Sequence, residues 1–288
     1  EELNFSEPNW VKENNLNDLK IAIGNVDSDE KIDIVMMYFN AENSKAFISV
    51  ADFTDTLNYK EPKQIDYVKN LVDSFITIGN ISSSYIKRGF IVDTPSLQDG
   101  YYVTNVFYLK DGVLQSKNFD LSITKPSYMP VIDIDFDGVL EIPYYSMTYR
   151  ASNDGNVDWY KFNTLNNSFK FWKQIYYNYN YNFKVQIADK LKGKIFVEND
   201  NENLSKQNSC QFNFYYYDDE FDYRKNLFSI IIENTKLEAE NKTVVSNKIK
   251  LCDYENYSYY YKINDYDELK KLKLTQENIK DSFSIIFE

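Results

Sequence analysis

Short runs in which apolar and polar residues alternate predict a protein built mainly from β-strands. In the first part of the chain these runs come in pairs, at 32–38 with 46–51, 89–93 with 101–109, and 141–149 with 159–162. Turn-forming residues separate the members of the first and third pairs at 40–43 and 153–156, and Asp111-Gly112 follows the second pair as a tight-turn signal. Residues 62–76 fit either a helical turn or a plain connection between strands.

A polar loop precedes each strand pair. The third loop, at 132–143, carries alternating carboxylates and a glycine: Asp133, Asp135, Asp137, Gly138 and Glu141. The matching residues are Asn25, Asp27, Asp29 and Asp33 in the first loop, and Asn80, Ser82 and Ser84 in the second. The loops begin at Asn25, Asn80 and Asp133, which are 55 and 53 residues apart. A period of this size with strand-like content predicts an array of β-blades.

From residue 181 the pattern changes, and the polar loop does not recur. Strand patterns follow at 184–190, 193–197, 211–217, 227–233, 248–251, 256–263 and 283–287, and Thr275 predicts the N-cap of a short helix. The fold class is therefore mainly β. We predict a β-propeller-like repeat domain at 1–180, which is partial or open because three repeats do not close a ring, and a small α+β domain with an antiparallel sheet at 181–288.

The acidic loop followed by an apolar pair resembles the FG-GAP/VCBS type of β-propeller repeat, which also occurs in integrin α-chains. The matching residues are 133–138 with 141–143, and more loosely 25–35. The layout is similar to clostridial-type extracytoplasmic lipoproteins, in which a propeller-like region precedes an α+β domain that the runs at 192–197 and 274–279 resemble. The resemblance implies a cell-surface protein, secreted or anchored to the membrane through a lost N-terminal anchor.

The resemblance also implies structural calcium. Loops of this type surround one ion with side-chain oxygens at the first, third, fifth and ninth positions and a backbone carbonyl at the seventh. In the third loop these ligands are Asp133, Asp135, Asp137, Glu141 and the carbonyl of Val139. In the first loop they are Asn25, Asp27, Asp29, Asp33 and the carbonyl of Lys31. The alternative is that the carboxylates bind the N–H groups of the turn itself, without metal.

The composition narrows the chemistry further. The chain has no histidine, which excludes histidine-dependent triads and histidine-ligated zinc and leaves carboxylate, lysine or tyrosine chemistry. A formal net charge of −12 without a basic stripe disfavours nucleic acids and anionic membrane surfaces as partners. The two cysteines, Cys210 and Cys252, fit either two reduced thiols or one disulfide.

These observations favour a non-enzymatic, extracytoplasmic binding or scaffolding protein whose partner is a protein or a cell-wall glycan. A carbohydrate-binding protein of the cell envelope is the first alternative, because the tyrosine runs at 176–181, 215–217 and 257–261 are suited to stacking on sugars. A carboxylate-dependent hydrolase is the second, with pairs such as Asp218-Asp219 or Asp133 and Asp137 as acid and base.

Overall fold

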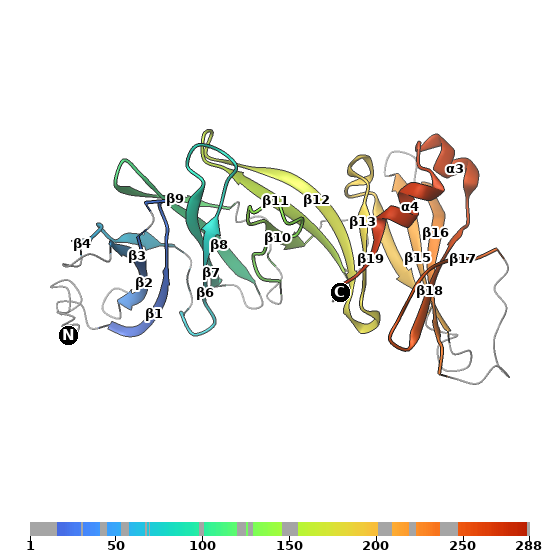
Figure 1. Ribbon diagram of the computed structural model, residues 1–288, viewed down its shortest axis with the longest axis horizontal. Coiled ribbons are helices and arrows are strands. Elements are labelled where there is room, and N and C mark those ends of the chain that lie inside the picture. The colour runs from blue at the N-terminus through green and yellow to red at the C-terminus, as the bar shows by residue number, and fades with distance from the viewer. Residues whose placement is uncertain are drawn as a thin grey trace. The chain divides into compact units, whose positions relative to one another are not determined.

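The described part of the chain is mainly β, with four antiparallel sheets and no closed barrel within it (Figure 1). This computed structural model describes residues 16–29, 31–40, 45–52, 58–66, 68, 70–97, 101–119, 125, 129–145, 155–200, 209–218, 223–236 and 247–286. The chain divides into two compact units. The N-terminal unit consists of Glu1–Tyr145 with Trp159–Trp172, and the C-terminal unit of Ser146–Asp158 with Lys173–Glu288.

The first sheet of the N-terminal unit has the order β1-β2-β3-β4, and β5 also pairs with β3. Its strands are β1 (Leu16–Gly24), β2 (Asp33–Asn40), β3 (Lys45–Asp52), β4 (Asn58–Tyr59) and β5 (Lys63–Ile65). The predicted strand pair at 32–38 and 46–51 is confirmed as the β2–β3 hairpin, in which Met36 lies opposite Ser49.

The second sheet has the order β6-β7-β8-β9. Its strands are β6 (Phe75–Asn80), β7 (Arg88–Pro95), β8 (Tyr102–Lys110) and β9 (Val113–Asn118). The tight turn predicted at Asp111-Gly112 joins β8 to β9, and both residues have positive φ, 52° and 74°. For residues 62–76, the described part contains β5, a bridge from Val68 to Ser96 and the start of β6, so the strand-connection interpretation holds there.

The third sheet has the order β10-β11-β12-β13-β19, and the division between the two units falls within β11 and β12. Its strands are β10 (Ile142–Tyr145), β11 (Asn156–Asn163), β12 (Ser168–Asn178), β13 (Phe183–Ile187) and β19 (Phe283–Ile285), with short 3-10 turns at η1 (Tyr179–Tyr181) and η2 (Asp189–Leu191). Most of β12 was not singled out by the sequence pattern, although the strand is 11 residues long.

Two apolar cores hold the N-terminal unit together. One contains Val35 and Ile48 from the first sheet together with Phe90 and Phe107 from the second. The other contains alternate residues of β7 and β8 together with third-sheet residues: Ile91, Val106, Tyr108, Ile142, Tyr144 and Phe162. Because successive side chains of β7 and β8 enter different cores, these two strands are buried on both faces.

The described part of the C-terminal unit contains a sheet of order β14-β15-β16-β18-β17 and the short helices α3 and α4 (Figure 1). These elements are β14 (Ile195–Asn199), β15 (Ser209–Asp218), β16 (Tyr223–Asn234), β17 (Ile249–Tyr254), β18 (Tyr257–Ile263), α3 (Tyr266–Lys271) and α4 (Gln276–Ser282). The predicted N-cap is confirmed, since the Thr275 hydroxyl accepts the Asn278 N–H and the Asn278 side chain accepts the Thr275 N–H.

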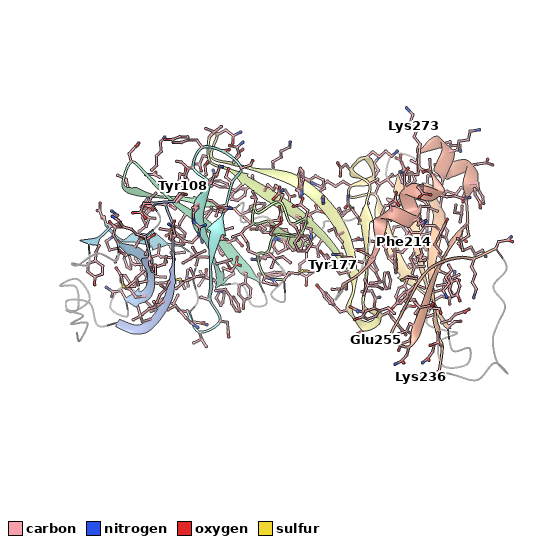
Figure 2. The ribbon with its side chains drawn as sticks, in the orientation of Figure 1. Tyr108, Tyr177, Phe214, Lys236, Glu255 and Lys273 are labelled. Carbon is pink, nitrogen blue, oxygen red and sulfur yellow. The ribbon has the colours of Figure 1, made fainter. Side chains whose placement is uncertain are left out.

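The core of the C-terminal unit is rich in aromatic side chains. Phe214, labelled in Figure 2, is fully buried there and stacks on Phe228 with ring centroids 4.5 Å apart. Cys210 and Cys252 are both free thiols, and burial raises the pKa of Cys210 to about 12. Among the helices of the described part, none has the length and apolar character needed to cross a membrane.

Candidate functional site

Each polar loop occupies the same place in its sheet. The first loop joins β1 to β2 and the second joins β6 to β7. The third loop runs from an isolated bridge at Ile132 to β10, and that bridge pairs Ile132 with Glu141 through N···O distances of 2.9 and 3.3 Å. The sequence alignment of the three loops therefore corresponds to equivalent positions in three sheets.

The first and third loops also share a backbone pattern. Asp33 Oδ2 accepts the N–H of Val26 at 2.8 Å, and the matching Glu141 Oε2 accepts the N–H of Ile134 at the same distance. The fourth residue of each loop has a left-handed φ, at 72° and 59° respectively: Ser28 and Phe136. The carboxylate at the ninth position thus binds a backbone amide at the loop entrance in both cases.

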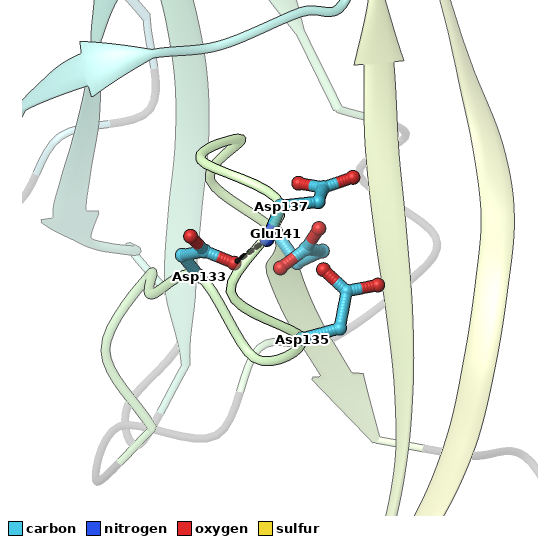
Figure 3. Close-up of side chains that lie close together, drawn as sticks. All are labelled: Asp133, Asp135, Asp137 and Glu141. Carbon is cyan, nitrogen blue, oxygen red and sulfur yellow. Dashed lines mark hydrogen bonds between the residues drawn. The ribbon is translucent and has the colours of Figure 1, made fainter.

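The third loop brings its four predicted carboxylates together (Figure 3). One oxygen from each of Asp133, Asp135, Asp137 and Glu141 lies within 4.8 Å of the others. Asp133 accepts the N–H of Asp137 at 3.2 Å, the dashed line in Figure 3, and that of Gly138 at 2.8 Å. Asp137 Oδ1 accepts the N–H of the residue two positions later, Val139, at 2.9 Å. Backbone amides therefore already satisfy part of this cluster, as the metal-free alternative expects.

Lys161, on β11, places its ammonium group among these carboxylates. Its Nζ contacts Asp137, lies 3.0 Å from Glu141 Oε1 and lies 3.6 Å from Asp135 Oδ2. The Lys161 side chain is 16% exposed and that of Glu141 is 0% exposed, so the pair is largely shielded from solvent. The third loop, predicted to surround calcium, thus contains a cation that the protein supplies itself.

Trp172, on β12, holds the other side of this arrangement. Its Nε1 donates to Asp135 Oδ2 at 2.7 Å, and Lys161 Nζ lies 4.1 Å from the centroid of its ring. Sequence reasoning missed both residues because they lie far from the loop in the chain. A signal for Lys161 was present, since it is the one charged residue in the otherwise aromatic predicted strand at 159–162.

The charges of this cluster stabilise one another. Burial raises the pKa of Glu141, and the Ile134 N–H and Lys161 partly offset that rise. Burial lowers the pKa of Lys161, but its hydrogen bonds to Asp137 and Glu141 and the surrounding negative charges outweigh burial and raise the pKa overall. Lys161 therefore stays an ammonium ion at neutral pH.

The first loop has three carboxylates where the third has four, and among the described residues no lysine lies between them. Asp27, Asp29 and Asp33 each place one oxygen within 4.8 Å of the others. Asp33 is 1% exposed, and burial together with the charges of Asp27 and Asp29 raises its pKa to about 6. The nearest described lysine contact is at Asp29, whose Oδ2 lies 3.9 Å from Lys31 Nζ. In the part of the chain that the structure describes, no ion pair with Asp27 or Asp33 occurs.

The remaining predicted ligands of the first loop bind within the loop. Asn25 Oδ1 accepts the N–H of Ser28 at 2.8 Å, and Asp29 Oδ1 accepts the N–H of Lys31 at 2.9 Å. Arg88, on β7 of the next sheet, donates from Nε to the backbone oxygen of Asn25 at 2.8 Å. Asp27 and Asp33 have no ammonium partner among the described residues, which distinguishes this loop from the third, where Lys161 lies among the carboxylates.

The second loop forms its hydrogen bonds with neutral side chains. Ser82 Oγ accepts the N–H of Ser84 at 3.1 Å, and Ser84 Oγ donates to Asn163 at 3.1 Å. Asn80 Nδ2 donates to the carbonyl of Gly138 at 2.9 Å, and the Asn80 carbonyl accepts the N–H of Leu140 at 2.8 Å. The second loop therefore ties its sheet to the third loop.

The groups considered for sugar binding or hydrolysis differ in exposure, and Tyr179 is the large exposed one among them, at 46%. Five tyrosines of the predicted stacking runs are buried: Tyr176, Tyr177, Tyr216, Tyr259 and Tyr261. Tyr215 is half-buried, and the Arg224 guanidinium lies 4.0 Å from its ring centroid while binding Glu198 at 2.5 Å. Asp218 accepts the Tyr216 hydroxyl at 2.9 Å, and its predicted partner Asp219 lies outside the described residues.

Comparison of the chain with protein-family models, with curated proteins and with solved structures gave no match. The resemblance to FG-GAP/VCBS repeats therefore stays a prediction from the sequence. The likeness between the first and third loops does not depend on this resemblance, because Asp33 and Glu141 form matching hydrogen bonds in the structure.

Proposed function

We propose that this is a non-enzymatic, extracytoplasmic binding or scaffolding protein of the lipoprotein type, with an open, propeller-like array of FG-GAP/VCBS-like repeats. Its partner is a protein or a cell-wall glycan at the cell surface. The observation that carries the proposal is that the acidic side chains bind other groups of the protein. In the third loop they bind backbone amides and Lys161, so they hold the structure together instead of facing a substrate.

Ties between neighbouring sheets support a scaffolding role. Asn80 in the second loop binds the backbone of Gly138 and Leu140 in the third. Arg88 of the second sheet binds the backbone of Asn25 in the first loop. A series of sheets fixed at their loops gives a rigid surface, which suits the recognition of a partner.

A groove in the C-terminal unit favours a protein partner over a sugar. It has a volume of about 360 Å³ and lies against α4 and β13. Seven of its twelve lining residues are apolar, one of them aromatic (Phe228), and the polar ones are Gln186, Lys190, Asn278, Asp281 and Ser282. An apolar groove of this kind accepts an apolar side chain of a protein, whereas sugar sites need polar groups beside an open aromatic face.

We also propose that calcium, where present, is structural and binds the first loop. Asp27, Asp29 and Asp33 are the residues that would hold it, and it would offset the burial and the repulsion between carboxylates that together raise the pKa of Asp33. In the third loop, the ammonium group of Lys161 lies among the carboxylates where the first loop would hold calcium.

The test is a binding experiment with isolated cell envelopes. We expect the purified chain to sediment with envelopes and to lose this binding when surface proteins are removed by protease. Binding that survives protease and appears on a glycan array would establish the carbohydrate-binding alternative instead. Hydrolysis of wall polymers by the purified chain, lost in Asp133→Asn or Asp137→Asn, would overturn the non-enzymatic proposal.

A further inference from the structure

Lys125 and Asp93 form a buried pair that the polar loops do not involve. Lys125 is 1% exposed and Asp93 is 4% exposed, and Lys125 Nζ contacts Asp93 Oδ2. The other oxygen of Asp93 accepts the hydroxyl proton of Thr104 at 2.7 Å. Thr104 lies on β8 directly opposite Asp93 on β7, so the strand register fixes this contact.

The topology explains how the lysine reaches the aspartate. Lys125 pairs with Tyr102 at the start of β8, and Tyr102 pairs on its other side with Pro95 of β7. Lys125 therefore approaches from beyond β8, and its side chain extends across that strand to β7. Neighbouring strands lie about 4.8 Å apart, a spacing that an extended lysine and an aspartate together bridge.

The surroundings of the pair are dry and hold a hydroxyl group beside it. Tyr144 is 1% exposed, and its buried hydroxyl has no hydrogen-bond partner among the described residues. Burial and the charge of Asp93 raise the pKa of Tyr144, so its hydroxyl keeps its proton. The Tyr144 ring stacks on Phe119 at 3.9 Å between centroids, which places aromatic surface, rather than water, on that side.

Burying two opposite charges costs free energy that their attraction only partly returns. Burial also lowers the pKa of Lys125, which increases the fraction of neutral amine. Transfer of the proton from Lys125 to Asp93 converts the ion pair into an amine beside a carboxylic acid. These are the two reactants of amide formation, held in contact where the water that would reverse the reaction is absent.

We propose that Lys125 and Asp93 condense to an amide that cross-links β7 to the segment at Lys125. The Nζ–Cγ bond forms and the Cγ–Oδ2 bond breaks. Oδ2 leaves as water, with the acid proton and one proton from Nζ. Thr104 polarises Oδ1, which becomes the amide carbonyl oxygen, and the proton passes directly from Nζ to Oδ2, because these two atoms are in contact. No oxidant, metal or other reactant takes part.

The test is the mass of the purified full-length chain and of its tryptic peptides. Pro126 follows Lys125 and blocks trypsin there, so the relevant peptides are 89–110 and 118–150 whether or not the link forms. We expect these two peptides to appear joined, with a mass lower than their sum by one water molecule. Separate peptides at full mass in the wild-type chain would overturn the proposal, and fragment ions locate the link without reference to any variant.

Three variants sharpen the result. Lys125→Arg keeps the positive charge but forms no such amide, so its peptides should be separate, and a joined species there would overturn the assignment. In Asp93→Asn, ammonia replaces water as the leaving group, so the joined species should have the wild-type mass. Lys60→Arg changes a lysine whose pair with Asp52 is 2.9 Å long and a quarter exposed, and it should leave the link intact.

Discussion

Lys161 is the residue that separates the third loop from the first. Both loops carry carboxylates at matching positions, and both bind backbone amides in the same way. In the third loop a lysine from β11 lies among the carboxylates and offsets one of their four negative charges. In the first loop burial and the charges of Asp27 and Asp29 raise the pKa of Asp33, and Lys31 contacts only Asp29. A single residue thus distinguishes the electrostatics of the two loops.

Removing Lys161 should destabilise the N-terminal unit. Lys161→Met leaves Asp135, Asp137 and Glu141 without their ammonium partner in a shielded position. Breaking a buried pair costs about 3–5 kcal/mol, and partial exposure reduces the expected loss here to about 2–3 kcal/mol. Urea unfolding measures this loss. Lys170→Met, an exposed position on β12, is the matched control and should change stability little.

Asp33 should make stability depend on pH. Its pKa is about 6 in the folded chain against about 3.9 when unfolded, so the folded state binds the proton more tightly. The resulting stabilisation is full below the unfolded pKa and is lost as pH rises through about 6, a change of about 1–2 kcal/mol after allowance for screening. Thermal melts without calcium between about pH 4 and pH 8 measure it.

Asp33→Asn should flatten this part of the pH profile, because its amide oxygen still accepts the Val26 N–H but carries no charge. Asp66→Asn, at an exposed carboxylate, should keep the wild-type profile. An unchanged profile in Asp33→Asn would show that another group titrates in this range.

At the scale of elements, the β7–β8 pair is the most constrained part of the N-terminal unit, because both of its faces are buried. Gly89 lies where the strand has no room for a side chain. A Cβ there would meet the Phe107 carbonyl oxygen at 2.3 Å and the Ile81 side chain at 2.7 Å. The first contact is with backbone, which does not move aside as a flexible side chain does.

Gly89→Ala should therefore destabilise the protein by about 1–3 kcal/mol through overpacking. Gly112→Ala is a useful comparison, because a Cβ there meets nothing within 4 Å and the cost is limited to the left-handed φ of 74°, about 1 kcal/mol. Urea titrations of both variants separate steric crowding from backbone strain. Equal losses would show that crowding at Gly89 is relieved by a shift of β8.

Elements with a local signal were predictable from the sequence. The β2–β3 hairpin, the Asp111-Gly112 turn and the capped helix α4 each follow from residues within a few positions of one another. Most of β12 was missed because its aromatic residues show little alternation, although it pairs with β11 and β13, its neighbours in the chain. The carboxylate clusters were predictable for the same local reason, whereas Lys161 and Trp172 reach the third loop only through the fold.

Over the whole molecule, the formal net charge of −12 makes cation binding favourable where carboxylates gather. We expect the wild-type chain to bind one calcium ion, in the first loop, and Lys161→Met to bind a second in the vacated third loop. Isothermal titration calorimetry counts the sites. Asp29→Asn should remove the first site and leave the second, and absence of binding in both proteins would mean that the loops are structural turns only.

An ammonium group on the chain differs from a metal ion in one further respect, which is its local concentration. A bound ion exchanges with the medium, so its occupancy follows supply and is lost to a chelator. Lys161 is tethered by its own strand and reaches the carboxylates of the third loop at an effective concentration that dilution does not change. Lys161 therefore stays beside these carboxylates whatever the ion concentration of the medium.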